Sequence, residues 1–181
     1  MSSKPAWLVD AEGKFKILEA RESSSGEWEV YVDSRGIIQF LAYLRGLEQS
    51  AFVHLADLSA YDDHPSSPRF NVFYELISMD TAKRMRVVAR VENDTKPELP
   101  SVYQLWKGAS WLEREAYDMY GIIFTGHPDL RRMLLPPSFK GHPLRKDFVV
   151  DYRQEFEVSS QDEPVFDPFG STVVQAEGDL K

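Results

Sequence analysis

The stretches FNVFYELISM at residues 70–79 and RMRVVARVE at residues 84–92 decide the predicted fold. Both are rich in aromatic or β-branched residues, which favour β-strands over helices. The two stretches follow each other with only a short segment between them. We therefore expect a β-hairpin, around which the rest of the domain is arranged.

Three further segments are predicted as strands. KFKILEARE at 14–22 and EWEVYVD at 27–33 alternate apolar and polar residues, and the turn-like sequence SSSG at 23–26 lies between them. SAFVHLADLS at 50–59 precedes the hairpin. Together with the hairpin, these segments predict five strands.

A helix is predicted between the second and third strands. Ser34 can cap its start, and Ile37, Leu41, Leu44 and Leu47 recur at helical spacing. One face of this helix should be apolar and lie against the sheet.

Two polar segments that contain prolines, 61–69 and 93–100, are expected to be surface loops. After the second loop, two capping boxes mark possible helix starts, each with a serine followed three residues later by glutamine or glutamate: Ser101 with Gln104, and Ser110 with Glu113. We therefore expect two short helices here.

The second of these helices is predicted from Trp111 to Tyr120, with Gly121 as its C-terminal stop. Three residues at helical spacing should form its buried stripe: Leu112, Ala116 and Met119.

This order of elements predicts an α+β fold. We expect a two-layer domain over residues 1–125, with a mixed sheet covered by helices on one face. An extended C-terminal segment at 126–150, which we call the basic arm, follows it. An acidic, loosely ordered tail is expected at 151–181.

Composition excludes several classes of function. The 181 residues are 43% hydrophobic, which is typical of a globular protein, and no apolar run approaches the ~20 residues of a membrane-spanning helix. The start of the chain lacks the apolar core of a secretory signal, so we expect the protein to stay in the cytosol. The chain has no cysteine, which excludes disulfides and cysteine-ligated clusters.

The basic arm differs from the rest of the chain. GHPDLRRMLLPPSFKGHPLRKDF at 126–148 contains Gly-His-Pro twice and has a net charge of +3, whereas the whole chain carries −8. Fully extended, it would span ~75 Å, several times the ~13 Å radius of gyration of a 100-residue domain. Its apolar residues need a surface to cover. The arm can fold back on its own domain or lie on another protein, and we expect the second.

Catalytic and metal sites are weighed against simpler structural roles. Glu115 and Asp118 lie on one helical face and could share a proton or a metal ion. The simpler interpretation is a solvated face on which Arg114 pairs with Asp118. His127 and His142 could bind zinc together with Asp129 or Asp147, but their spacing matches no known metal motif. We find no phosphate-binding or nucleophile-elbow motif. No catalytic, cofactor-binding or metal-ligating residue is therefore expected.

Two stretches carry a family resemblance. ERE..D..G..F..HPDLRR.L from Glu113 to Leu134, followed by GHPLRKDF at 141–148, resembles the signature of the 30-kilodalton subunit family of respiratory complex I, which is the C subunit of NADH-quinone oxidoreductase. LADL at 55–58 and F-x-V-x-Y-E-L at 70–76 are similar to the family's second and third strands. Val149 departs from the family pattern, in which proline follows the phenylalanine.

The resemblance implies a non-catalytic structural subunit in the hydrophilic part of a proton-pumping NADH:quinone oxidoreductase. It implies no cofactor in this chain, with FMN and iron–sulfur clusters in partner subunits. The implied partners are the D subunit, which helps form the quinone site, and the B and I subunits, which carry iron–sulfur clusters. The implied location is peripheral, on the cytoplasmic side of the membrane, with no membrane span in this chain.

The resemblance also implies that the basic arm clamps neighbouring subunits, with each Gly-His-Pro turn aiming a basic pair at a partner. The expected partner-interface residues lie on the second helix and in the arm: Glu113, Arg114, Glu115, Asp118, His127, Pro128, Asp129, Arg131, Arg132, His142, Pro143, Leu144, Arg145, Lys146 and Asp147.

Three alternatives stay open. The first is an equivalent subunit of a ferredoxin- or other donor-linked quinone reductase, or of a membrane-bound hydrogenase. The second is a nucleic-acid-binding module that uses the basic arm, but the arm offers only Phe139 and Phe148 for stacking, and the rest of the chain carries −11. The third is a metal hydrolase.

Overall fold

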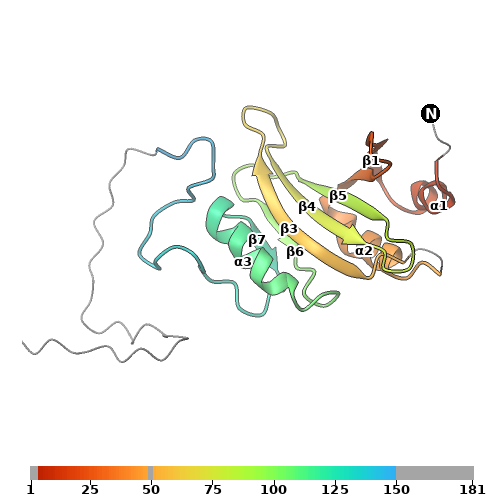
Figure 1. Cartoon of the computed structure of the whole chain (residues 1–181). Helices are drawn as coiled ribbons and strands as arrows, with labels where there is room; N and C mark the ends of the chain where they lie inside the picture. The colour runs from red at the N-terminus through yellow and green to blue at the C-terminus, as the bar shows by residue number, and fades with distance from the viewer. Residues whose placement is uncertain (1–3, 49–50, 150–181) are drawn as a thin grey trace, which may run out of the picture.

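The computed structural model describes residues 4–48 and 51–149, which form an α+β fold (Figure 1). Its centre is a five-stranded sheet in the order β1-β2-β5-β4-β3. The strands are β1 Ile17–Glu22, β2 Trp28–Asp33, β3 His54–Asp62, β4 Phe70–Ile77 and β5 Arg84–Val91. Strand β2 pairs with β5 in parallel, and the other neighbours are antiparallel, so the predicted mixed sheet is confirmed.

The predicted hairpin is the middle of this sheet. Val72 of β4 faces Ala89 of β5, and Tyr74 faces Val87. All four side chains are buried, because they point to the face that the helices cover. A two-residue side-chain period and burial on one face fix this register, since a slip of one residue would expose the whole set.

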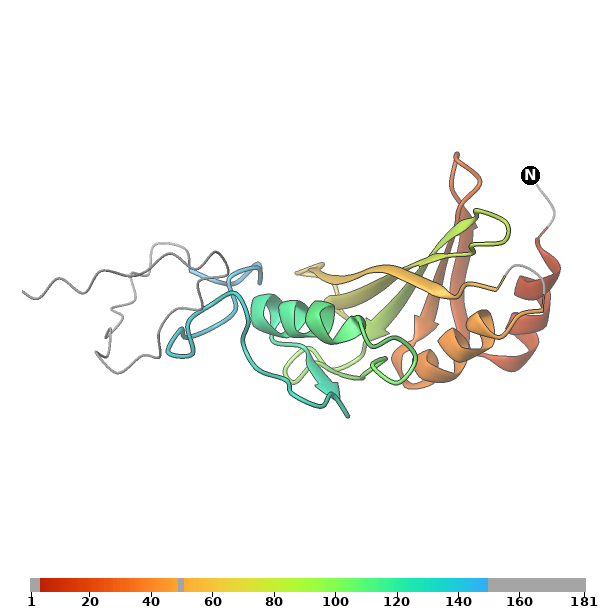
Figure 2. The same cartoon turned by 60° about the horizontal axis from the view of Figure 1, so that its bottom comes forward.

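Helices α2 Ile37–Arg45 and α3 Ala109–Tyr120 lie on the same side of the sheet (Figure 2). Ile37, Leu41 and Leu44 of α2 are fully buried, as their spacing predicts. The cap differs from the prediction. A short 3₁₀ turn, Ser34–Gly36, precedes α2, and the Asp33 carboxylate, not Ser34, accepts the Arg35 N–H.

Three elements were not predicted: α1, β6 and β7. Helix α1 Ala6–Lys14 packs Leu8 and Ala11 into the core, but it is short, and too few of its residues are buried for a clear helical period. Strand β7 Ile123–Thr125 pairs in parallel with β6 Glu98–Pro100. The expected loop at 93–100 therefore ends in a strand, because Leu99 enters the core.

The expected first helix after Ser101 is absent, and turns replace it between 103 and 108. The Ser101 hydroxyl still accepts the Tyr103 N–H, but it donates to Glu113 instead of starting a helix. Helix α3 ends as predicted at Gly121, which adopts a left-handed conformation with φ of 73°.

Among the described residues, none of the helices has the length and apolarity required to cross a membrane. The acidic tail at 151–181 lies outside the described residues.

Leu41→Ala should lower the free energy of unfolding by about 2–5 kcal/mol, because the side chain is fully buried between α2 and the sheet. Urea unfolding of the full chain measures this. Leu18→Ala on the edge strand β1, where the side chain is 44% exposed, is the control and should cost well under half as much. Equal losses would contradict the described packing of α2.

Candidate functional site: helix α3 and the basic arm

The basic arm, described as far as residue 149, runs beside α3 in the same direction as the helix. Near the start of α3, Ser110 Oγ lies 3.1 Å from His127 Nε2. About one turn further on, Arg114 donates to the carbonyl oxygens of Arg131 at 3.2 Å and of Arg132 at 3.3 Å. The helix thus holds the arm through its polar side chains.

Asp118 makes four hydrogen bonds to the arm. Its side chain is fully buried, and one carboxylate oxygen accepts three consecutive backbone N–H groups, from Met133 at 3.0 Å, Leu134 at 2.8 Å and Leu135 at 2.9 Å. The other oxygen accepts from Arg132 Nη1 at 2.7 Å. Burial acts to raise the pKa of Asp118, but these four donors outweigh it and hold the pKa below its usual range.

The arm also closes the C-terminal end of α3, where backbone carbonyls lack partners within the helix. His142 Nδ1 lies 2.9 Å from the Asp118 carbonyl oxygen, which can only accept, so Nδ1 carries the proton. Arg145 Nε donates to the Tyr120 carbonyl oxygen at 2.6 Å, and its guanidinium carbon lies 5.1 Å from the centre of the Phe70 ring. Burial lowers the pKa of His142, which favours the neutral ring.

Gly121 is required by this packing. A Cβ at this position would lie 2.5 Å from both His142 Nε2 and Arg145 Nη2, closer than real contacts allow. The positive φ of Gly121 adds backbone strain to any substitution. The C-terminal end of α3 and the packing of His142 and Arg145 against it therefore depend on the same glycine.

A second anchor joins the arm to the β3–β4 hairpin. Arg69 binds Asp62 on one side and Asp147 at 3.0 Å on the other, and the Lys146 N–H donates to Asp62 at 2.9 Å. Burial acts to raise the pKa of Asp62, but the Arg69 guanidinium and the Lys146 and His64 N–H groups lower it to about 2. These contacts join residues about eighty positions apart in the chain.

Glu113 faces the core and not the solvent. It is fully buried and accepts hydrogen bonds from the Ser101 hydroxyl and from the Val102 N–H, both at 2.6 Å. Burial raises its pKa to about 7, although both hydrogen bonds act to lower it. Glu113 therefore positions the loop that leads into α3, and the predicted capping box with Ser110 does not form.

The structure corrects two expectations about these residues. The Arg114–Asp118 pair on a solvated face is wrong, because Asp118 is buried and binds Arg132 instead. Arg132 and Arg145 were expected to point at a partner, but in this chain they bind a carboxylate and a carbonyl group of α3. The alternative that the arm folds back on its own domain accounts for these contacts.

His127 and His142 do not contact each other. His127 contacts Ser110 near the start of α3, and His142 contacts Asp118, eight residues or ~12 Å of helix further on. Within residues 4–48 and 51–149, no group of three or more His, Asp or Glu side chains is placed to hold a metal ion.

The remaining candidates lie toward the surface. Glu115 and Pro143 are half-buried. Six candidates are exposed: Pro128, Asp129, Arg131, Leu144, Lys146 and Asp147. Contact with a partner stays a prediction for all fifteen residues.

Sequence reasoning missed Asp62, Arg69 and Val102, and it assigned Ser101 to a capping box instead of a contact with Glu113. The first two belong to YDDHPSSPR, which predicts only a polar loop. No local pattern indicates that Asp62 and Asp147 share one arginine, because their contact depends on the path of the whole chain.

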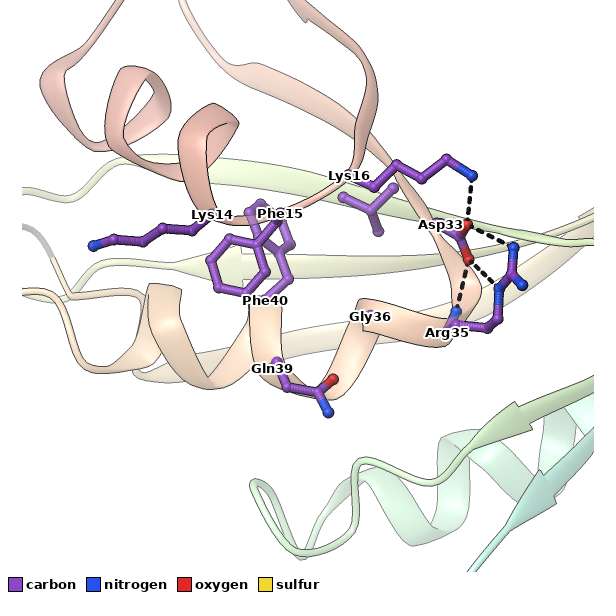
Figure 3. Close-up of a pocket in the computed structure, with 9 residues that line it drawn as sticks. Lys14, Phe15, Lys16, Asp33, Arg35, Gly36, Gln39 and Phe40 are labelled. Carbon is purple, nitrogen blue, oxygen red and sulfur yellow. Dashed lines mark hydrogen bonds and ion pairs between the residues drawn. The ribbon is translucent and has the colours of Figure 1, made fainter.

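A separate cavity of about 440 Å³ lies beside the start of α2 (Figure 3). Phe15 and Phe40 form part of its wall, and three of its four charged groups, Lys16, Asp33 and Arg35, bind one another, while Lys14 binds Asp10. Asp33 accepts from Lys16 Nζ at 2.8 Å and from the Arg35 guanidinium at 3.2 Å. These contacts cap the turn before α2, so they account for Lys16, Asp33 and Arg35 without a ligand.

Comparison with known proteins identifies relatives of the chain. The family described as "Respiratory-chain NADH dehydrogenase, 30 Kd subunit" matches residues 30–154. Two proteins named as the C subunit of NADH-quinone oxidoreductase, from Brucella ovis and Brucella abortus (strain 2308), are each 45% identical over 133 residues. The aligned stretch covers 74% of this chain and 65% of each relative, so the chain spans about two-thirds of their length.

The fold is also found in a solved structure. A chain from the structure titled "Structure of the membrane-bound sulfane sulfur reductase (MBS), an archaeal respiratory membrane complex" superposes with a TM-score of 0.67. The match covers 87% of this chain and 97% of the other at 23% identity. This likeness establishes a shared fold.

Asp118→Ala should lower the free energy of unfolding by about 3–5 kcal/mol, because it leaves Arg132 and three backbone N–H groups without their acceptor. Hydrogen exchange should become faster at Met133, Leu134 and Leu135. Glu115→Ala, at a half-buried position on the same helix, is the matched control and should cost under about 1 kcal/mol. Unchanged exchange in Asp118→Ala would show that another contact holds the arm.

Acid should release the second anchor. The folded pKa of Asp62, about 2, lies below the ordinary value of about 4, so its stabilisation is present above pH ~4 and is lost as the pH falls toward 2. Asp62→Asn should therefore be less stable than the wild type at pH 5, and the difference should vanish by pH 2. Urea unfolding at both pH values tests this. A constant difference across the range would contradict the described contact.

Proposed function

Because the chain belongs to the 30 Kd subunit family of respiratory-chain NADH dehydrogenase, we propose that it is a structural subunit of a proton-pumping NADH:quinone oxidoreductase. In this proposal, neighbouring subunits carry FMN, the iron–sulfur clusters and the quinone site. The chain itself carries no electron-transfer group, which its lack of cysteine supports for iron–sulfur clusters.

The single observation that supports an assembly role is the way α3 holds the basic arm. As far as residue 149 the arm contains neither helix nor strand, yet Asp118, Arg114 and Arg69 bind it along its length. A segment that is already ordered loses little conformational entropy when it docks, so it can bind a partner more tightly than a free tail. The domain thus preorganises the arm for contact.

The outer surface of this unit carries suitable anchors. Trp111 on α3 and Leu134 and Leu144 in the arm are more than half exposed, although they are large and apolar. Arg131 is 71% exposed and pairs with the exposed Asp129 at 2.9 Å. Aromatic and arginine side chains are enriched at the centre of protein interfaces, and the two exposed leucines add apolar area that a partner can cover.

We propose that this surface contacts the D subunit, which helps form the quinone site, and the iron–sulfur B and I subunits. The chain then lies at the cytoplasmic side of the membrane through the complex and not through a span of its own. The partner-interface role is assigned first to the exposed residues of the arm. The interface role is supported indirectly by Asp118, Arg132 and Arg145, whose contacts fix the path of the arm along α3.

A second candidate is the equivalent subunit of a complex with another electron donor. The chain shares its fold with a chain of a sulfane sulfur reductase complex. The fold therefore occurs in more than one kind of respiratory complex, which supports this second candidate. Proteins that co-purify from gently solubilised membranes separate the two. Nucleotide- and flavin-binding subunits would support NADH as the donor, and their replacement by other subunits would support the alternative.

Arg131→Ala should deplete the chain from the membrane complex and leave the melting temperature of the free chain nearly unchanged. Its exposed pair with Asp129 contributes under about 1 kcal/mol to folding. A guanidinium buried against a partner would contribute ~2–5 kcal/mol to assembly, a factor of roughly 30 to several thousand in affinity. Co-purification, quinone reduction by NADH and thermal melts of the free chain measure these effects.

Two control variants complete the experiment. Arg132→Ala should lower the melting temperature of the free chain, because it breaks the pair with Asp118. Arg84→Ala, exposed on β5, should leave both folding and assembly unchanged. Normal assembly of Arg131→Ala would remove this arginine from the proposed interface.

A further inference from the structure

A buried carboxyl group lies where α3 meets the sheet, and the proposed assembly role does not use it. Glu113 is fully buried, and its two described donors are neutral: the Ser101 hydroxyl and the Val102 N–H, both at 2.6 Å. A carboxylate held only by neutral donors in an apolar core is costly, and taking up a proton removes that cost.

The side chain that could supply a positive charge beside Glu113 is His127, whose Nε2 lies 4.0 Å from Glu113 Oε2. Its hydrogen bonds argue against a positive charge. His127 Nδ1 accepts the Asp129 N–H at 3.0 Å, so this nitrogen bears no proton. Nε2 carries the proton and lies 3.1 Å from the Ser110 carbonyl oxygen, a group that can only accept. The imidazole is therefore neutral, and Glu113 faces it without an ion pair.

A second titratable group, Tyr74 of β4, faces Glu113 from the sheet. Its hydroxyl is fully buried and has no hydrogen-bond partner in the described structure. Burial raises the pKa of Tyr74, and the charge of a Glu113 carboxylate would raise it further, so the phenol is neutral. Two neutral groups, the phenol and the imidazole, thus surround the carboxyl group.

The Ser101 hydroxyl suits a carboxyl group that changes its protonation state. A hydroxyl donates to a carboxylate and accepts from a carboxylic acid, so the 2.6 Å contact can persist in either state. Ser101 also accepts the Tyr103 N–H at 3.1 Å, which ties this contact to the loop before α3. A change of proton at Glu113 reverses the direction of this hydrogen bond and adds or removes a buried charge beside that loop.

We propose that Glu113 is a proton-binding site, protonated when the 101–103 loop and the 126–129 turn close around it, and that loss of this proton loosens both segments. The site joins the sheet, α3 and the start of the basic arm, so the proton stabilises the joint between them. Glu113 acts as a positioning residue and not as a catalytic one.

The sign of the pH effect follows from burial, which raises the pKa of Glu113 to about 7. The ordinary value in an unfolded chain is about 4.3. The stabilisation is therefore complete below pH ~4.3 and is lost as the pH rises toward 7. This window is distinct from that of Asp62, which lies below pH ~4 and has the opposite sign.

The direct test is NMR of the full-length chain with ¹³C-labelled glutamate side chains, titrated from pH 4.5 to 8.5. One carboxyl resonance should titrate with a midpoint near 7, and Glu113→Gln should remove it. The Val102 and Asp129 amide resonances should shift with the same midpoint. A Glu113 midpoint below pH ~5.5, or amides that do not follow it, would overturn the proposal.

Stability supplies a second readout. The ratio of folded to unfolded wild-type chain should fall by up to about tenfold per pH unit between pH ~5 and ~7. Glu113→Gln, which imitates the protonated state, should lose this slope, whereas Glu115→Gln on the same helix should keep it. A slope that Glu113→Gln retains would overturn the proposal. The carboxyl titration needs only the wild-type chain, so it decides the question even if Glu113→Gln does not fold.

Discussion

The buried carboxylate of Asp118 is the interaction on which the C-terminal half of the described structure depends. It accepts three consecutive backbone N–H groups and one guanidinium N–H, all from the arm. A segment with four prolines between 128 and 143 cannot satisfy its backbone through a helix of its own. Asp118 supplies the acceptor that the chain lacks locally, and the segment takes one defined path along α3.

Two buried carboxyl groups on one helix show how strongly the donors decide the outcome. Asp118 and Glu113 are both fully buried, and burial alone would raise the pKa of each. Four donors, one of them cationic, lower the pKa of Asp118, whereas two neutral donors leave that of Glu113 raised to about 7. The first group is thus a fixed charge that orders the arm, and the second is a place where a proton can bind.

The same arrangement gives a physical reason for a structural subunit to have an ordered yet irregular surface. Arg69 and Asp118 hold the arm from behind, while Leu134, Leu144 and Arg131 stay exposed on its outer side. Preorganisation of this kind lowers the entropic cost of association and leaves specificity to the exposed side chains. In the proposed complex, the fold contributes to association because it fixes the positions of these exposed side chains.

The sequence by itself determined the five strands, helix α2 and the stop at Gly121, because these depend on local periodicity and backbone preference. It also indicated the unusual arm and the family. Only the tertiary structure decided that Glu113 and Asp118 are buried and that Arg132 and Arg145 bind α3. It also showed that Asp62 and Asp147 share Arg69. A helical pattern predicts which face of the helix a carboxylate lies on, but the partners of Glu113 and Asp118 lie 11 to 17 residues away in the chain. Burial and pairing depend on the path of the chain, which no local pattern encodes.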